Sequence, residues 1–184
     1  MNERGNTASR AAHTRGRLLD QARAAGEESQ FVLDRFAVER LLYRLSVSPH
    51  RDQFLLKGAL LFALWFDAPH RPTRDADLLG FGPPDPDRLR AVITELCAID
   101  CDDDLRFDVS SIQVLPIRQE AAYEGLRARL VAILGGARCH VQWDVGFGDA
   151  VTPAPVEGAD QRRVGDVRRS RWHVYPHKTD FAEK

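Results

Sequence analysis

The chain has 184 residues and a formal net charge of −1; 43% of its residues are hydrophobic and 29% are charged. These values are typical of one globular domain with its own core, and a near-neutral charge does not by itself indicate a nucleic-acid partner. Three scattered cysteines argue against a disulfide framework and a zinc site, and no apolar run of about 18 residues is present, so we expect a cytoplasmic protein without a membrane partner.

The N-terminal quarter of the chain predicts an arm followed by two helices. Residues 1–17 are polar and rich in arginine, which favours a disordered N-terminal arm. Residues 18–25 predict a short helix that ends at Gly26. Residues 31–45 predict a longer helix, because their apolar side chains recur at steps of three and four residues.

The next segment begins with a short apolar strand over residues 54–56 and the turn Lys57-Gly58. An apolar segment of helical length follows over residues 59–66. A glycine at such a turn lets the backbone approach a ligand closely. The pair by itself is nevertheless explained as simply by an ordinary turn from strand to helix.

Asp75 and Asp77 lie at the start of a predicted strand over residues 75–79. Side chains alternate along a strand, so both carboxylates point to the same face. Such a pair becomes favourable when a divalent cation lies between its members, and Mg²⁺ is typically held by one or two carboxylates together with substrate phosphates. The pair therefore predicts a metal-dependent phosphoryl or nucleotidyl transfer site. Arg74 next to it is either a structural counter-charge or a contact for a triphosphate.

The second half of the chain predicts one helix and then three strands. The helix runs from about Pro86 to Ile99 after a capping Asp85 or Asp87, and the acidic residues 100–104 predict a solvated turn. The strands cover residues 107–117, 126–134 and 138–146. The first has an irregularity at its two serines, and a Gly-Gly hairpin turn joins the last two.

Asp144 lies near the end of the last of these strands. A lone aspartate at this place is usually a turn or cap residue, but beside an Asp-x-Asp strand it becomes a candidate third metal ligand. Beyond Val151 the chain continues as a proline-containing connector and an arginine-rich stretch over residues 160–171. That stretch is either a solvated linker or a source of sequence-independent contacts to RNA phosphates.

Four blocks of the sequence together resemble the AbiEii-type nucleotidyltransferase toxins, a type IV toxin–antitoxin family of the DNA-polymerase-β-like nucleotidyltransferase superfamily. They are FLLKGALLF, RPTRDADLLGFG, VQWDVGFGDAVTPAP and VYPHKTDFAEK. The match runs from about Phe31 to Pro155 and resumes at Val174. It implies an α+β nucleotidyltransferase fold, in which helices flank a mixed β-sheet and adjacent strands carry the catalytic carboxylates.

The resemblance also implies an activity and partners. The family's toxins, which serve in abortive infection and phage defence, use a nucleoside triphosphate and Mg²⁺ or Mn²⁺ to transfer a nucleotide to an acceptor. In some relatives this acceptor is the 3′ end of tRNA. A cognate antitoxin is therefore an expected partner, and tRNA or another RNA is an expected acceptor.

The family's pattern gives roles to individual residues. Asp75 and Asp77 correspond to the catalytic, metal-binding pair, with Asp144 as a third metal-binding acid. Lys184 corresponds to the lysine of the family's Ala-Glu-Lys motif, which resembles a phosphate-contacting or catalytic lysine.

Three further residues are expected to bind the nucleotide. Gly58 lies where the glycine and helix N-terminus of the family cradle phosphate, and Lys57 belongs to the same Lys-Gly block. Arg74 is placed to neutralise charge on the triphosphate.

Two departures from the family's pattern affect the expected domain organisation. Residues 156–171 are arginine-rich where the family has an apolar segment, and the helical region that the family carries beyond Lys184 is absent. We therefore expect a nucleotidyltransferase domain over residues 18–155, and a diverged basic linker with the start of a truncated helical region over residues 156–184. The alternative function is a catalytically incompetent remnant that only binds an antitoxin or RNA.

Overall fold

A computed structural model describes residues 3–58, 60, 73–117, 125–148, 156–159 and 171–174 of the chain. Two helices come first, a 3-10 turn, two strands and a third described helix follow, and the described elements after that helix are all strands. In chain order the elements are α1 (Glu3–Ala25), α2 (Ser29–Ser46), the 3-10 turn η1 (Arg51–Gln53), β1 (Phe54–Lys57), β2 (Ala76–Gly80), α4 (Pro86–Ala98), β3 (Arg106–Ile117), β4 (Gly125–Leu134), β5 (Ala137–Phe147), β6 (Val156–Ala159) and β7 (Arg171–Val174).

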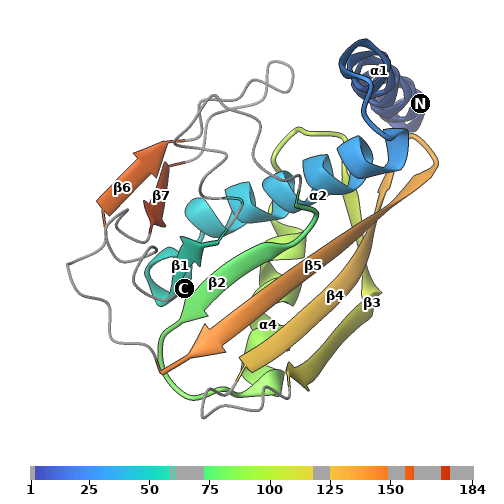
Figure 1. Cartoon of the computed structure of the whole chain (residues 1–184). Helices are drawn as coiled ribbons and strands as arrows, with labels where there is room; N and C mark the ends of the chain where they lie inside the picture. The colour runs from blue at the N-terminus through green and yellow to red at the C-terminus, as the bar shows by residue number, and fades with distance from the viewer. Residues whose placement is uncertain are drawn as a thin grey trace.

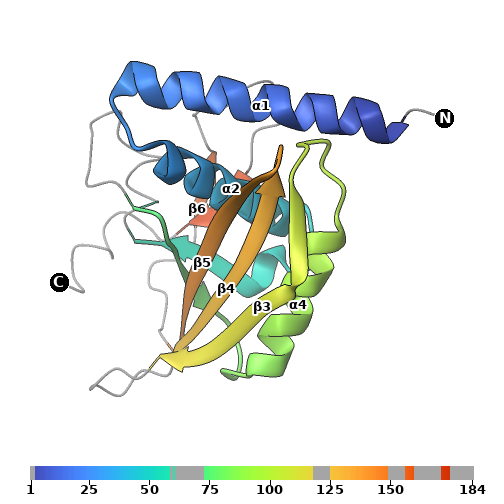
Figure 2. The same cartoon turned by 90° about the vertical axis from the view of Figure 1, so that its right-hand side faces the viewer.

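The strands form one mixed sheet in the order β3-β4-β5-β2-β1-β7-β6. The β2–β5 and β1–β7 pairs are parallel, and the other neighbours are antiparallel. Helices α2 and α4 lie on one side of the sheet (Figure 1), and α1 lies across one end of the strands (Figure 2). The predicted α+β fold, with helices flanking a mixed sheet, is confirmed.

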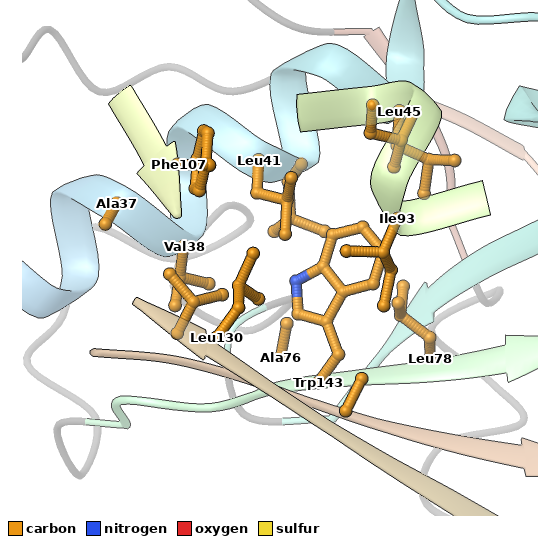
Figure 3. Packing of buried hydrophobic residues seen from close by; sticks show 14 of the residues in the cluster. Ala37, Val38, Leu41, Leu45, Ala76, Leu78, Ile93, Phe107, Leu130 and Trp143 are labelled. Carbon is orange, nitrogen blue, oxygen red and sulfur yellow. The ribbon is translucent and has the colours of Figure 1, made fainter. Parts of the chain in front are cut away.

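The core lies between the sheet and these two helices. Trp143 of β5 is fully buried there, beside Ala76 and Leu78 of the neighbouring strand β2 (Figure 3). Because side chains alternate along a strand, burying these three residues against the helices turns Asp77 and Asp144 to the opposite face of the sheet. The packing of the core thus decides where the two carboxylates point.

Most of the predicted elements are found within one or two residues of their expected ends. Helix α4 begins as predicted, with the Asp85 carboxylate accepting a hydrogen bond of 2.9 Å from the backbone N–H of Asp87. The pairing of β3 with β4 shifts register between Asp108 and Gln113, around the two serines. Gly135 and Gly136 form the hairpin turn, both with positive φ.

The N-terminal segment differs from the expected disordered arm. Residues 3–25 form the single helix α1, and Ala11 and Leu18 belong to the buried core. The Arg15 guanidinium donates a hydrogen bond of 2.7 Å to the carbonyl oxygen of Gly135 in the β4–β5 turn. The helix is stabilised by contacts with residues that are distant in sequence. The arginine-rich composition of the segment does not show these contacts, and the prediction of a disordered arm was therefore wrong.

The acidic turn over residues 100–104 also differs from its prediction. The Asp103 side chain is almost completely buried and accepts hydrogen bonds of 2.6 Å and 3.0 Å from Arg44 and of 2.9 Å from Arg40. Both arginines belong to α2. Asp103 therefore ties the loop after α4 to the central helix, where a solvated turn was expected.

Two strands lie where a basic linker was expected. β6 pairs with β7, and β7 adds to the β1 edge of the sheet. The predicted helix over residues 59–66, except Leu60, and most of the arginine-rich stretch lie outside the described residues. None of the described helices is long and apolar enough to cross a membrane.

Candidate active site

Four charged side chains form a row across the middle of the sheet, on the face turned away from α2 and α4. Asp77 on β2 is in register with Lys57 on β1 and with Asp144 on β5, and Asp144 is in register with Arg127 on β4. We call this set (Arg127, Asp144, Asp77 and Lys57) the charged row. Residues in register on neighbouring strands point to the same face at about 5 Å separation. Two carboxylates therefore lie side by side with a cation at each end. The strands that carry the carboxylates, β2 and β5, run parallel (Figure 1).

Arg127 and Asp144 form a bidentate pair. Arg127 Nε donates to one oxygen of Asp144 at 2.8 Å, and its terminal nitrogen donates to the other oxygen at 2.6 Å. Both side chains are half-buried. The hydrogen bond that Arg127 donates to Asp144 is the main cause of the raised pKa of Arg127, so the guanidinium stays charged. Of the predicted carboxylates, Asp144 thus has an internal counter-charge that the sequence reasoning did not identify.

Asp75 lies one residue before β2, which begins at Ala76 rather than at Asp75 as expected. Burial raises the pKa of Asp75, and the negative charge of Asp144 raises it further, whereas Arg127 and Arg129 act in the opposite direction. Its carboxyl group therefore lies in the field of the charged row. A group of carboxylates that disfavour one another's ionisation is an arrangement that a bound cation stabilises.

The Lys57-Gly58 turn lies directly against the carboxylate of Asp77. Gly58 has a φ of +77°, and a Cβ atom at this position would lie 2.3 Å from Asp77 Oδ2. The side chain of Lys57 reaches across β2, because its Nζ lies 3.5 Å from where a Cβ of Gly146 on β5 would be. Only glycine fits at position 58, and the lysine ammonium lies on the same face as the acidic residues.

The other two predicted site residues are placed differently. Arg74 forms an ion pair with Glu28, and its guanidinium lies 5.6 Å from the centre of the Phe31 ring. In this arrangement Arg74 is directed to the start of α2. Lys184 lies outside the described residues.

The donor set suits a hard divalent cation held by few protein ligands. Within the described ranges, no three side chains of His, Cys, Asp or Glu are grouped closely enough to hold a metal ion as they stand. Mg²⁺ does not require such a cage, since it commonly binds one or two carboxylates and keeps water and phosphate oxygens as its other ligands. Asp75 and Asp77 beside the Lys57-Gly58 turn fit this mode, with Asp144 adjacent.

The comparisons with known proteins give one match. The family model described as "Nucleotidyl transferase AbiEii toxin, Type IV TA system" matches residues 40–184, which is well over half of the chain. Neither the curated proteins nor the solved structures contain a match to this sequence. The matched range includes every residue of the charged row, and it supports the predicted nucleotidyltransferase fold.

Proposed function

The chain belongs to the AbiEii family of nucleotidyltransferase toxins of type IV toxin–antitoxin systems, and we propose that it transfers a nucleotide from a nucleoside triphosphate to the 3′ end of an RNA, with tRNA as the first candidate. The family's place in a toxin–antitoxin system implies an antitoxin partner. The acceptor, the divalent metal and the role of each residue are parts of the proposal.

The observation that carries the proposal is the register of Asp77 with Asp144, at the junction where β2 and β5 run parallel. In this proposal Asp75 and Asp77 hold Mg²⁺ or Mn²⁺, and Asp144 is the third ligand. A bound divalent cation supplies charge neutralisation for the triphosphate and for the pyrophosphate that leaves. The raised pKa of Asp75 supports the assignment, because a carboxylate with this electrostatic surrounding gains from a nearby cation.

We assign the triphosphate to the β1 side of the carboxylates. The Lys57 ammonium lies close to Gly146, and from there it can contact phosphates that are bound over β2 and β5. Gly58 adds no side chain to the turn beside Asp77, so that phosphate oxygens can approach its N–H groups. Arg74 joins this group if it leaves Glu28, and Lys184 is retained from the family's motif as a second phosphate contact.

We assign the acceptor to the other side, over β3, β4 and β5. Leu55 and Leu79 share the face of the charged row and are buried, at 1% and 0% exposure, so the β1–β2 end of this face is covered. Leu115 on β3, in register with Arg127, is 55% exposed. An RNA end that has to reach the carboxylates would therefore enter over β3 and β4, where Arg127 and Arg129 can contact its phosphates.

Transfer of labelled nucleotide tests the proposal. Purified protein is incubated with total tRNA and each α-labelled nucleoside triphosphate, with and without Mg²⁺ or Mn²⁺. We expect metal-dependent labelling that falls by about a hundredfold or more in Asp77→Asn, as for other losses of charge stabilisation at a reacting phosphate. The matched control is Asp87→Asn, an exposed carboxylate of α4 on the opposite side of the sheet from the charged row, which should label normally.

Two results would contradict the proposal. Labelling that is unchanged in Asp77→Asn would show that the charged row is not the reaction site. A folded protein that binds RNA but labels no acceptor with any triphosphate would instead favour the binding-module alternative.

A further inference from the structure

The charged row contains one interaction that the proposed function leaves unexplained. A third metal ligand needs oxygen lone pairs that face the cation, yet both oxygens of Asp144 accept hydrogen bonds from Arg127, at 2.8 Å and 2.6 Å. A planar guanidinium on a carboxylate in this geometry is among the stronger hydrogen-bonded ion pairs in proteins. Asp144 is therefore already neutralised by a residue of this chain.

We propose that Arg127 competes with the divalent cation for Asp144, so that Arg127 serves as a positioning residue that sets the metal affinity of the site. The inference rests on the proposed function, because it assumes that Asp75, Asp77 and Asp144 hold a metal. In the metal-free protein the positive charge of the guanidinium offsets part of the repulsion between Asp144 and Asp77. When a cation is bound by all three carboxylates, Arg127 gives up its hydrogen bonds to Asp144.

Simple electrostatics supports this competition. A cation that accepts the oxygens of Asp144 would lie only a few ångströms from the guanidinium, and like charges at this distance repel appreciably even near a protein surface. The absence of a metal-ready group of three ligands in the described part of the chain agrees with this view. Arg127 donates to both oxygens with which Asp144 would join such a group.

The surroundings of Arg127 provide a place for the released guanidinium. Its register partner on the edge strand β3, Leu115, is more than half exposed, so the guanidinium borders an open surface. A guanidinium binds phosphate with the same two-pronged geometry with which it binds a carboxylate. The release of Asp144 would therefore present Arg127 to a phosphate of the incoming nucleotide or acceptor, and would couple metal binding to substrate binding.

Arg129 supplies a matched control. It lies on the same strand and the same face, two residues from Arg127, and donates a hydrogen bond of 2.8 Å to the neutral side chain of Gln142. The positive charges of both arginines act to lower the pKa of Asp75. Replacing either one removes a positive charge from the site, but only the replacement of Arg127 frees Asp144.

The test is a calorimetric titration with Mn²⁺, without nucleotide, of the wild-type chain, Arg127→Met, Arg129→Met and the double variant Arg127→Met/Asp144→Asn. We expect Arg127→Met to bind Mn²⁺ about tenfold more tightly, on the scale of a charged hydrogen bond that no longer competes. Arg129→Met should change the Kd by about twofold or less, because its effect acts only through screened charge. The double variant should lose the gain.

The outcomes separate this inference from the proposed function. Weaker Mn²⁺ binding in Arg127→Met, or equal changes in the two arginine variants, would overturn the competition while the metal site itself stands. If none of the proteins, including Arg127→Met, binds Mn²⁺, both the inference and the metal-dependent function are overturned.

A measurement on the unaltered protein keeps the inference testable if Arg127→Met fails to fold. In wild-type protein the NMR signal of the Arg127 Nε–H group should shift when Mg²⁺ is added, because its hydrogen bond to Asp144 is released. The corresponding signal of Arg129 should stay nearly constant. An Arg127 signal that does not move when Mg²⁺ saturates the site would overturn the inference.

Discussion

Gly58 is the residue at which a single added methyl group should affect both stability and metal binding. Its φ of +77° is strained for any residue with a Cβ, and the Cβ of Gly58→Ala would lie 2.3 Å from Asp77 Oδ2. Asp77 cannot retreat along the sheet, because its backbone pairs with β1 on one side and with β5 on the other. The carboxylate itself has to rotate away from its place in the charged row.

The expected cost has two parts. The positive φ costs an alanine about 1–2 kcal/mol, and forcing the Asp77 side chain off its preferred rotamer adds about 0.5–1.5 kcal/mol. Gly58→Ala should therefore lower the free energy of unfolding by about 1.5–3.5 kcal/mol. Displacing one metal-binding carboxylate should weaken Mn²⁺ binding by about tenfold, the scale of one lost contact between charged groups.

Gly136→Ala is the matched control for the backbone part. Gly136 has a φ of +81°, but nothing lies within 4 Å of the place where its Cβ would be. Urea denaturation followed by circular dichroism should show the smaller cost of about 1–2 kcal/mol in Gly136→Ala, and calorimetry should show unchanged Mn²⁺ binding. Equal losses of stability in the two variants, with Mn²⁺ binding intact in Gly58→Ala, would refute the contact between Gly58 and Asp77.

Two further predictions concern carboxyl groups in contrasting surroundings. Burial opposes ionisation of Asp103, but the hydrogen bonds and charges of Arg44 and Arg40 outweigh burial and lower the pKa. Asp103→Ala should therefore lower the free energy of unfolding in urea by about 3–5 kcal/mol. The control Asp102→Ala, which removes an exposed carboxylate, should lower it by about 0–1 kcal/mol. Since the stability from a lowered pKa is lost only as pH falls through the folded-state value, the Asp103 difference should persist down to about pH 4. The pKa of Asp75 is raised, first by burial, so ionisation of this group opposes folding as pH rises. Metal-free Asp75→Asn should therefore melt at a higher Tm than wild type at neutral pH, and this gain in Tm should vanish by about pH 4. Scanning calorimetry across this pH range tests the prediction. A gain in Tm that is the same at pH 4 and at pH 7 would contradict it.

The pairing of β4 with β5 and the direction of the two acidic residues could be predicted from the sequence because local pattern decides them, whereas the parallel pairing of β2 with β5 joins segments that lie far apart in the chain. Alternation along β2 and β5 turns Asp77 and Asp144 away from the core, and the Gly-Gly hairpin turn fixes which β4 residue faces Asp144. The same register argument could have identified Arg127 before the structure was known.

The features that sequence reasoning missed depend on contacts distant in the chain. Helix α1 is stabilised by the burial of Ala11 and Leu18 and by the contact of Arg15 with the β4–β5 turn, and none of these is visible in the composition of residues 1–17. Asp103 looks like one acidic residue among several, and only the fold brings it to Arg44, which lies 59 positions away. Local patterns identify elements, but they do not show which charged residue of a turn will be buried.

The charges of the candidate site compensate one another within the protein. Four carboxylate and cation positions lie in register across β4, β5, β2 and β1, and the two carboxylates at the centre would destabilise the sheet if they were not compensated. Lys57 and Arg127 bring the charged row to formal neutrality. A divalent cation that enters this row makes it positive overall, and an incoming triphosphate or RNA end, which is strongly negative, restores the balance. On this argument metal and substrate should bind more tightly together than either does alone, and Arg127 is the residue whose change of partner joins the two events.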